Sequence, residues 1–271
     1  MVIDLILLMP KYIDIACNFT HQAFDKNLQK VIEDSVKAGI EKFVVTCSSL
    51  KDLERIKEIK SRYKESIFFT AGIHPHCAKE IHQIEHSKIK EEILKLKPNA
   101  IGETGLDFNR NFSSPSDQLA SFILHLETAT DAKLPLYLHQ RDAHDDFFGI
   151  LKELHTSDNN FVVHCFTGNK KELTDYLDMG GYIGITGWIC DYRRNQDLSE
   201  AIRYIPLDKL MVETDCPYLL PKNLSPKPKK NLNYPYHLPH IVKEIANIRN
   251  ESEELIAEYA YENTMKFFNP A

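Results

Sequence analysis

The chain has 271 residues, 43% of them hydrophobic, and a formal net charge of −6 at pH 7. This length suits one barrel-sized domain with a full hydrophobic core. The acidic balance excludes nucleic-acid binding through the overall charge, so any such binding must rest on local basic groups and on metal ions.

The first nine residues are apolar apart from Asp4. They are too few to cross a bilayer, which takes about 20 apolar residues, and they lack the basic start of a signal peptide. We therefore expect no membrane partner. Met9 is an alternative start, in which case residues 1–9 are a non-native or disordered extension of a single domain that covers residues 1–271.

Eight short apolar runs are predicted to be strands, and they alternate with helical patterns. The strands are predicted near residues 12–17, 42–47, 67–73, 99–103, 135–139, 161–165, 182–186 and 210–215. Their continuous apolar character is typical of parallel strands buried on both faces. Between them, apolar residues recur at helical spacing, as in a helix that ends before Gly39 and in one that Ser114 caps and Pro115 begins. This order predicts an α/β fold, a (β/α)8 TIM barrel of the metal-dependent hydrolase type.

A metal-binding side chain lies at or just beyond the carboxyl end of six of these strands. In chain order the six are Asn18, His74, Glu103, His139, His164 and Asp215, of which Asn18 is the weakest candidate. The strands of a barrel bring such ends to one face, where active sites are found. The pattern predicts a hydrolase with a metal site.

Taken alone, each strand-end residue leaves several roles open. Glu103 lies between two glycines and could bridge two metal ions or pair with an arginine in a turn. His139 and His164 could be metal ligands or structural histidines. Asp215 could be a ligand, a general base or a structural carboxylate. We favour a functional role for each of these residues. For His139 and His164 we favour metal binding, because they end consecutive predicted strands.

Two long connections, residues 107–112 and residues 216 to about 240, are candidate substrate-binding elements. His74 could contact a substrate phosphate or a metal-bound water, whereas His76 is better suited to anchor its loop. Arg141 and Arg110 could bind phosphate or could simply be solvated. The six cysteines show no C-x-x-C spacing of the kind found in zinc and redox sites, so we expect a reduced compartment and a cytoplasmic protein.

Five sequence blocks resemble the signature segments of TatD-type deoxyribonucleases. They are Gly72-Ile-His-Pro-His76, Ile101-Gly-Glu-Thr-Gly-Leu-Asp-Phe108, Leu138-His-Gln-Arg-Asp-Ala143, Val163-His-Cys-Phe-Thr-Gly168 and Val212-Glu-Thr-Asp-Cys-Pro-Tyr218. The resemblance implies a magnesium-dependent nuclease with 3′→5′ exonuclease activity on single-stranded DNA and RNA, linked to DNA repair. It also implies that Glu103, His139 and His164 bind metal and that Asp215 is the strand-eight aspartate of the family.

One departure from the family affects the metal sites. Many members have His-x-His at the end of the first strand, where this chain has Asn18-Phe19-Thr20. A neutral amide oxygen is a weaker ligand than imidazole for transition metals. We therefore expect one tight site at Glu103, His139 and His164 and a second, weaker site between Glu103, Asp215 and Asn18. The expected ion is Mg²⁺, with Mn²⁺ as a substitute, and the expected catalytic base is Asp215.

The predicted substrates are the ends of single-stranded DNA or RNA, and the predicted state is a monomer. The first alternative is an amidohydrolase-type enzyme that hydrolyses a C–N or ester bond of a small molecule on a similar barrel. Many such enzymes use a carbamylated lysine where this chain has Glu103, and the adjacent Arg141 favours a phosphate substrate. The second alternative, a non-catalytic nucleic-acid-binding protein, is disfavoured by the acidic charge.

Overall fold

Eight parallel strands form the centre of the fold in the computed structural model, which describes residues 10–156 and 159–269. The strands are β1 (Tyr12–Cys17), β2 (Ile40–Val45), β3 (Ile67–Ala71), β4 (Ala100–Asp107), β5 (Leu136–Arg141), β6 (Phe161–His164), β7 (Tyr182–Ile185) and β8 (Leu210–Val212). Each pairs with the next, and a bridge between Cys17 and Cys216 joins the end of β1 to the segment that follows β8. The predicted (β/α)8 barrel is confirmed. The extension expected at residues 1–9 lies outside the described residues.

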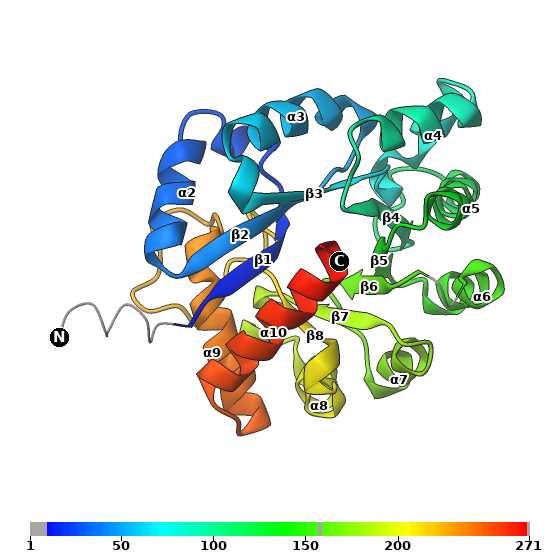
Figure 1. Ribbon diagram of the computed structural model, residues 1–271. Coiled ribbons are helices and arrows are strands. Elements are labelled where there is room, and N and C mark those ends of the chain that lie inside the picture. The colour runs from blue at the N-terminus through cyan, green and yellow to red at the C-terminus, as the bar shows by residue number, and fades with distance from the viewer. Residues whose placement is uncertain (1–9, 157–158, 270–271) are drawn as a thin grey trace.

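Helices follow the strands in turn and surround the barrel (Figure 1). The α-helices are α2 (Leu28–Lys37), α3 (Leu53–Arg62), α4 (His86–Lys95), α5 (Pro115–Ala132), α6 (His144–Leu154), α7 (Lys170–Asp178), α8 (Gln196–Ala201), α9 (Leu238–Arg249) and α10 (Glu253–Phe268). Short 3-10 helices are η1 (Gln22–Phe24), η2 (Leu50–Asp52), η3 (Lys64–Ser66), η4 (Pro75–His82), η5 (Gly187–Cys190), η6 (Ile202–Tyr204), η7 (Leu207–Lys209) and η8 (Pro235–His237). As predicted, Ser114 caps α5, since its hydroxyl accepts the N–H of Asp117. Within the described residues, no helix is both long and apolar enough to cross a membrane.

The carboxyl-terminal helix α10 covers one end of the barrel (Figure 1). Its last residues, Phe267 and Phe268, are each 1% exposed. Phe268 stacks on Phe68 of β3, and Phe267 packs edge-to-face on Tyr182 of β7. Asn99, just before β4, donates to the Phe268 carbonyl at 2.9 Å. Because these partners lie at the amino ends of the strands, α10 fills that end, and the carboxyl end remains for the loops that build a site.

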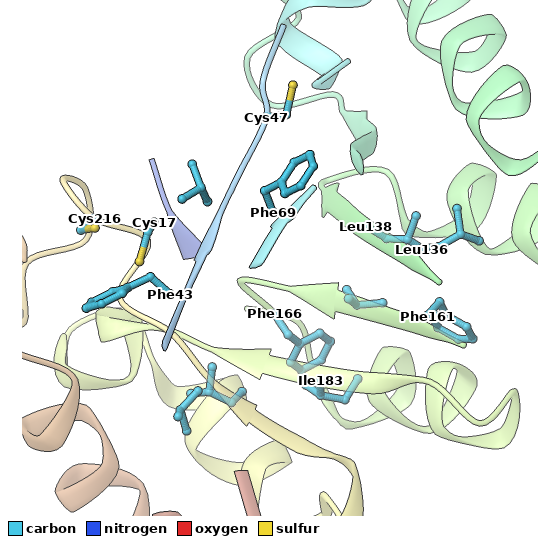
Figure 2. Packing of buried hydrophobic residues seen from close by; sticks show 14 of the residues in the cluster. Cys17, Phe43, Cys47, Phe69, Leu136, Leu138, Phe161, Phe166, Ile183 and Cys216 are labelled. Atoms are coloured by element: carbon cyan, nitrogen blue, oxygen red, sulfur yellow. The ribbon is translucent and has the colours of Figure 1, made fainter. Parts of the chain in front are cut away.

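Buried apolar side chains also pack along the strands, as Figure 2 shows for Phe43 of β2, Leu138 of β5 and Phe161 of β6. These side chains belong to the large core cluster that includes buried residues of the surrounding helices. At the carboxyl end, Cys17 and Cys216 lie side by side where β1 meets β8. The continuous apolar runs therefore reflect strands that are buried by helices on one face and by the barrel interior on the other.

Several predicted strand ends were wrong. β4 continues to Asp107, four residues beyond the predicted end, because Gly105, Leu106 and Asp107 still pair with β5. β8 ends at Val212 rather than at residue 215, because the N–H and hydroxyl of Thr214 bind the carboxylate of Asp14 instead of a neighbouring strand. β2 and β3 each end two residues earlier than predicted, and the loop after β8 ends at η8, before residue 240.

His125 of α5 ties this helix to the segment that follows β3. Its Nε2 accepts the backbone N–H of Ile73 at 3.0 Å, and its Nδ1 donates to the Ser121 carbonyl at 2.6 Å. Burial lowers the pKa of His125 to about 4, since a charged ring would be without water. Because His74 follows Ile73 in the chain, this contact holds the backbone of a candidate site residue.

The pKa of His125 predicts a loss of stability in mild acid. An unfolded histidine has a pKa of about 6.5. Between these two pKa values the unfolded chain binds more protons than the folded protein. The contribution of neutral His125 to folding stability is therefore fully present above pH 6.5 and is lost as the pH falls toward 4. Between pH 7 and pH 4.5, we expect the free energy of unfolding to fall by about 2 kcal/mol more in the wild type than in His125→Gln. Urea denaturation at both pH values measures this, and equal pH dependence in the two proteins would contradict a buried neutral His125.

Candidate metal centre and active site

Glu103 lies in the barrel mouth because two glycines let β4 run close to β5. Gly102 and Gly105 have φ values of +147° and +140°, which favour glycine. A Cβ on either would collide with the carbonyl oxygen of Tyr137 or His139. Glu103 itself is 5% exposed. The Gly-Glu-Thr-Gly sequence thus places the Glu103 carboxylate out of contact with most water, so neighbouring side chains must compensate its charge.

Three imidazole rings surround one oxygen of this carboxylate. Glu103 Oε1 lies 2.7 Å from His164 Nε2, 3.1 Å from His139 Nδ1 and 3.2 Å from His74 Nε2. Burial alone would raise the pKa of Glu103, but the charge of His164 and hydrogen bonds with His139 and His164 hold it well below its usual value. Burial alone would lower the pKa of His164, but the charges of Glu103 and Glu213 raise it well above its usual value. Glu103 is therefore held as a carboxylate, and His164 is its protonated partner.

Glu213 orients His164 from the barrel interior. Its Oε2 lies 3.3 Å from His164 Nδ1 and accepts the Tyr137 hydroxyl at 3.3 Å, while its Oε1 accepts the N–H of Cys165. A carboxylate at Nδ1 keeps a proton there, so Nε2, the atom that faces Glu103, is the one that would lose its proton to bind a cation. Sequence reasoning assigned no role to Glu213, although its position two residues before Asp215 was a usable signal.

Asp107 and His76 lie behind His139. Asp107 Oδ2 is 2.7 Å from His76 Nε2 and 3.6 Å from His139 Nε2, and its Oδ1 accepts the N–H of Arg110 at 2.8 Å. Burial would raise the pKa of Asp107, but the nearby His139 ring and a hydrogen bond with His76 hold it far below its usual range. His76 thus joins the segment after β3 to the end of β4, in keeping with its expected anchoring role. Asp107, which we had assigned to a loop, is a strand residue that supports the site.

His74 carries its ring proton toward Glu103. Its Nδ1 accepts the N–H of His76 at 3.0 Å, and burial lowers its pKa to about 4, so the ring is neutral. A neutral ring whose Nδ1 accepts has its proton on Nε2, the atom that faces Glu103. His74, Glu103 and His139 do have ligand atoms within 4.8 Å of one another. In this tautomer, however, His74 is a hydrogen-bond donor, which fits a contact with substrate or water better than metal binding.

The atoms Glu103 Oε1, His139 Nδ1 and His164 Nε2 fit a divalent cation. They lie 2.7, 3.1 and 3.3 Å from one another. Ligands held about 2.1 Å from a cation and about 90° apart are separated by about 3.0 Å. The other nitrogen of His139, Nε2, is buried without a hydrogen-bond partner among the described residues. A small shift of this ring toward Asp107 would provide that partner and would orient Nδ1 as a ligand.

Asp215, which follows β8, and Asn18, which follows β1, are in contact at the junction of these two strands. Asn18 Nδ2 donates to Asp215 Oδ1 at 2.9 Å and to the Cys216 carbonyl at 3.1 Å. Asn18 Oδ1 accepts the Thr46 hydroxyl at 2.9 Å. Burial raises the pKa of Asp215 to about 7, and the charge of Glu103 acts in the same direction. Asn18 thus positions Asp215, and its role as a metal ligand stays a prediction.

A second group of possible ligands, Asp14, Cys17 and Cys216, is better explained as a structural junction. Its ligand atoms lie within 4.8 Å of one another. The Asp14 carboxylate, however, already accepts the N–H of Ala16 and both the N–H and the hydroxyl of Thr214. These hydrogen bonds join β1 to β8 and so hold the segment that carries Asp215.

The two candidate phosphate-binding arginines differ in exposure. Arg141 ends β5 and is half-buried, whereas Arg110 is exposed in the connection after β4. The arginine ion pairs found within residues 10–156 and 159–269 involve Arg55, Arg193, Arg194 and Arg249. The guanidinium groups of Arg141 and Arg110 therefore have no acidic partner within the described residues, which leaves them available to a phosphate.

Comparison with known proteins gives consistent matches along the chain. A family model described as TatD related DNase matches residues 13–269. The 3′-5′ ssDNA/RNA exonuclease TatD of Escherichia coli (strain K12) is 39% identical over 258 residues, covering 95% of this chain and 99% of the relative. The protein of the same name from Rahnella sp. (strain Y9602) is 41% identical over 257 residues, covering 94% and 97%. The crystal structure of a hydrolase TatD family protein from Entamoeba histolytica has a TM-score of 0.88 at 26% identity, covering 97% and 99%.

The site geometry predicts which residues hold a cation. We expect Glu103→Ala and His164→Ala to weaken Mn²⁺ binding by at least about 100-fold, because each removes a ligand, a larger change than loss of a supporting residue causes. His74→Gln keeps a hydrogen-bond donor beside Glu103, so it should change the affinity by less than about 10-fold. Calorimetric titration with Mn²⁺ measures all three. If His74→Gln loses Mn²⁺ as completely as His164→Ala does, the assigned tautomer of His74 is wrong.

Proposed function

Because the chain belongs to the family of TatD-related DNases, it is a hydrolase of phosphodiester bonds, and we propose that it removes nucleotides from the 3′ ends of single-stranded DNA and RNA with Mg²⁺. The observation that carries the proposal is a set of three mutually close ligand atoms, from Glu103, His139 and His164, together with the half-buried carboxylate of Asp215, whose pKa is raised to about 7. The direction and the preference for single strands are taken from the names of the two exonuclease relatives.

Glu103, His139 and His164 would hold the tighter cation, with Mn²⁺ able to replace Mg²⁺ because imidazole ligands accept it. The chemistry that a bound divalent cation supplies here is positive charge, which polarises the phosphodiester and lowers the pKa of a nearby water. A second, weaker site would depend on Glu103, Asp215 and the substrate phosphate. Asn18 would contribute little to it, because its amide oxygen already accepts a hydrogen bond from Thr46.

Asp215 would take the proton of the attacking water. Its Oδ1 accepts the amide of Asn18, so Oδ2 is the oxygen that remains for the proton. The pKa of about 7 places Asp215 near the optimum for a general base at neutral pH. Positive charge in the site would lower this pKa and so increase the fraction of the carboxylate form.

His74, Arg141 and Arg110 would bind the substrate phosphates. The Nε2–H of His74 points at Glu103 Oε1 and could turn to a phosphate oxygen once that carboxylate is neutralised. Arg141 and Arg110 supply local positive charge on a protein whose net charge is −6, which is how an acidic protein can still bind nucleic acid. Hydrolysis of a small-molecule C–N or ester bond is less well supported, because the full-length relatives named above are exonucleases.

An assay on end-labelled oligonucleotides tests the proposal. We expect a 5′-labelled single-stranded DNA or RNA to shorten stepwise from its 3′ end in Mg²⁺ or Mn²⁺. Excess chelator should stop the reaction, because the phosphodiester is then no longer polarised. A blunt duplex of the same sequence should be cut more slowly. Internal cuts, release of nucleotides from the 5′ end only, or no cleavage together with hydrolysis of an amide or lactone would each contradict the proposal.

The role of Asp215 is testable separately from metal binding. Asp215→Asn should lower kcat by at least about 100-fold, since an amide cannot accept the proton of water. The affinity of the tighter site for Mn²⁺ should stay within a few-fold of wild type, because its three proposed ligands are untouched. Single-turnover kinetics and Mn²⁺ titration give the two numbers. Normal turnover in Asp215→Asn would exclude Asp215 as the base.

A further inference from the structure

Two exposed aromatic side chains stand on opposite sides of the barrel mouth. Phe112 lies in the connection after β4 and is 61% exposed, and Tyr218 lies in the connection after β8 and is 51% exposed. In a closed barrel with strands in the order β1 to β8, β4 and β8 are four strands apart in both directions. The two rings therefore flank the site rather than cluster on one side of it.

Phe112 is linked to the site through two histidines. Its ring lies 4.7 Å from that of His76, at an interplanar angle of 77°, and the ring of His76 lies 4.3 Å from that of His74. His74 in turn contacts Glu103. Because His76 is held by Asp107, Phe112 rests on a fixed support while most of its surface faces water.

Tyr218 is linked to the site through the backbone of Asp215. Its N–H donates to the Asp215 carbonyl at 2.8 Å, and its ring lies 5.6 Å from that of His21, edge-to-face. Burial raises the pKa of its hydroxyl, and the charges of Asp215 and Glu103 add to this effect. Tyr218 is therefore held next to Asp215 through the backbone while about half of its surface stays accessible.

Single exposed apolar side chains are common and need no explanation. The position of these two is informative because both follow strand ends at the face that carries the site. Nucleic-acid bases stack on aromatic rings with little dependence on sequence, and this contributes much of the affinity of proteins for single strands. In a duplex the bases are stacked on one another and are not free to do so. A net charge of −6 gives no overall attraction to nucleic acid, so contacts to bases would complement the local phosphate contacts.

We propose that Phe112 and Tyr218 bind the unpaired bases of the substrate end by stacking, one ring on each side of the phosphodiester being cleaved. The inference rests on the proposed function and specifies how that site recognises its substrate. It assigns to these residues the preference for single strands over duplexes and the tolerance of different base sequences. Arg141 and Arg110 then contact phosphates, and the two rings contact bases.

The test compares two 5′-labelled single strands of equal length. One carries normal bases, and the other carries abasic tetrahydrofuran residues at its three 3′-terminal positions, so its phosphates are kept and its bases are absent. We expect Phe112→Leu and Tyr218→Leu each to lower kcat/KM on the normal strand by about 10-fold, mainly through KM, because stacking contributes to binding. On the abasic strand the same variants should match the wild type.

Conservative and distant variants serve as controls. Phe112→Tyr and Tyr218→Phe keep an aromatic ring and should keep the preference of the wild type for the normal strand. Tyr204→Leu removes a 50% exposed tyrosine at the end of η6, in the connection that leads to the amino end of β8, so it should leave both rates unchanged.

The outcomes distinguish failure of the stacking role from failure of the proposed exonuclease activity. Equal losses on the normal and abasic strands, or no loss in either leucine variant, would overturn the stacking role while leaving the exonuclease in place. A wild-type protein that cleaves neither strand would overturn the proposed function, and the stacking role with it.

Discussion

A carboxylate that is 5% exposed inside a protein is stable only when nearby groups compensate its charge, and Glu103 meets this condition with imidazole rings from three different segments. The requirement explains much of the surrounding structure. The glycines on both sides let the strand approach β5, and the strand ends deliver His139 and His164 to the same oxygen. A carboxylate that pairs with a protonated ring is well suited to a cation, which can replace that proton and bind the same atoms.

Supporting residues give each part of the site a defined orientation. Glu213 fixes the proton of His164 on Nδ1, and Asp107 stands behind His139. Asn18 holds one oxygen of Asp215 and leaves the other available. The carboxylates around the site thus have different environments. Glu103 and Asp107 have lowered pKa values, whereas Asp215 has a raised pKa. Glu103 and Asp107 therefore stay ionised, and Asp215 is the carboxylate suited to accept a proton.

Much of the fold and the main candidate residues could be predicted from the sequence, because strand burial and strand order leave clear patterns. Continuous apolar runs marked the eight strands, and a barrel brings their carboxyl ends together whatever the details of packing. The ends themselves were less predictable. β8 ends before Thr214 because Thr214 hydrogen-bonds to Asp14, two hundred residues away in the chain. No local sequence pattern predicts such a partner.

The supporting residues were missed for the same reason. Asp107 and Glu213 look like ordinary polar residues near strand ends, and only the packing of the barrel shows that one faces His139 and the other His164. The tautomer of His74 also depends on a backbone N–H from His76 that the sequence does not reveal. The aromatic rings at the mouth were not recognised, since a Phe or Tyr in a connection is equally compatible with burial.

The central claim is that Glu103, His139 and His164 form one preferred cation site and that any second site near Asp215 is weaker. Anomalous diffraction at the manganese edge, from crystals grown with limiting Mn²⁺ and no nucleotide, tests this directly. The account predicts one strong peak among Glu103, His139 and His164, with a weak peak or none near Asp215. Two peaks of equal strength, or a peak only at Asp14, Cys17 and Cys216, would contradict it.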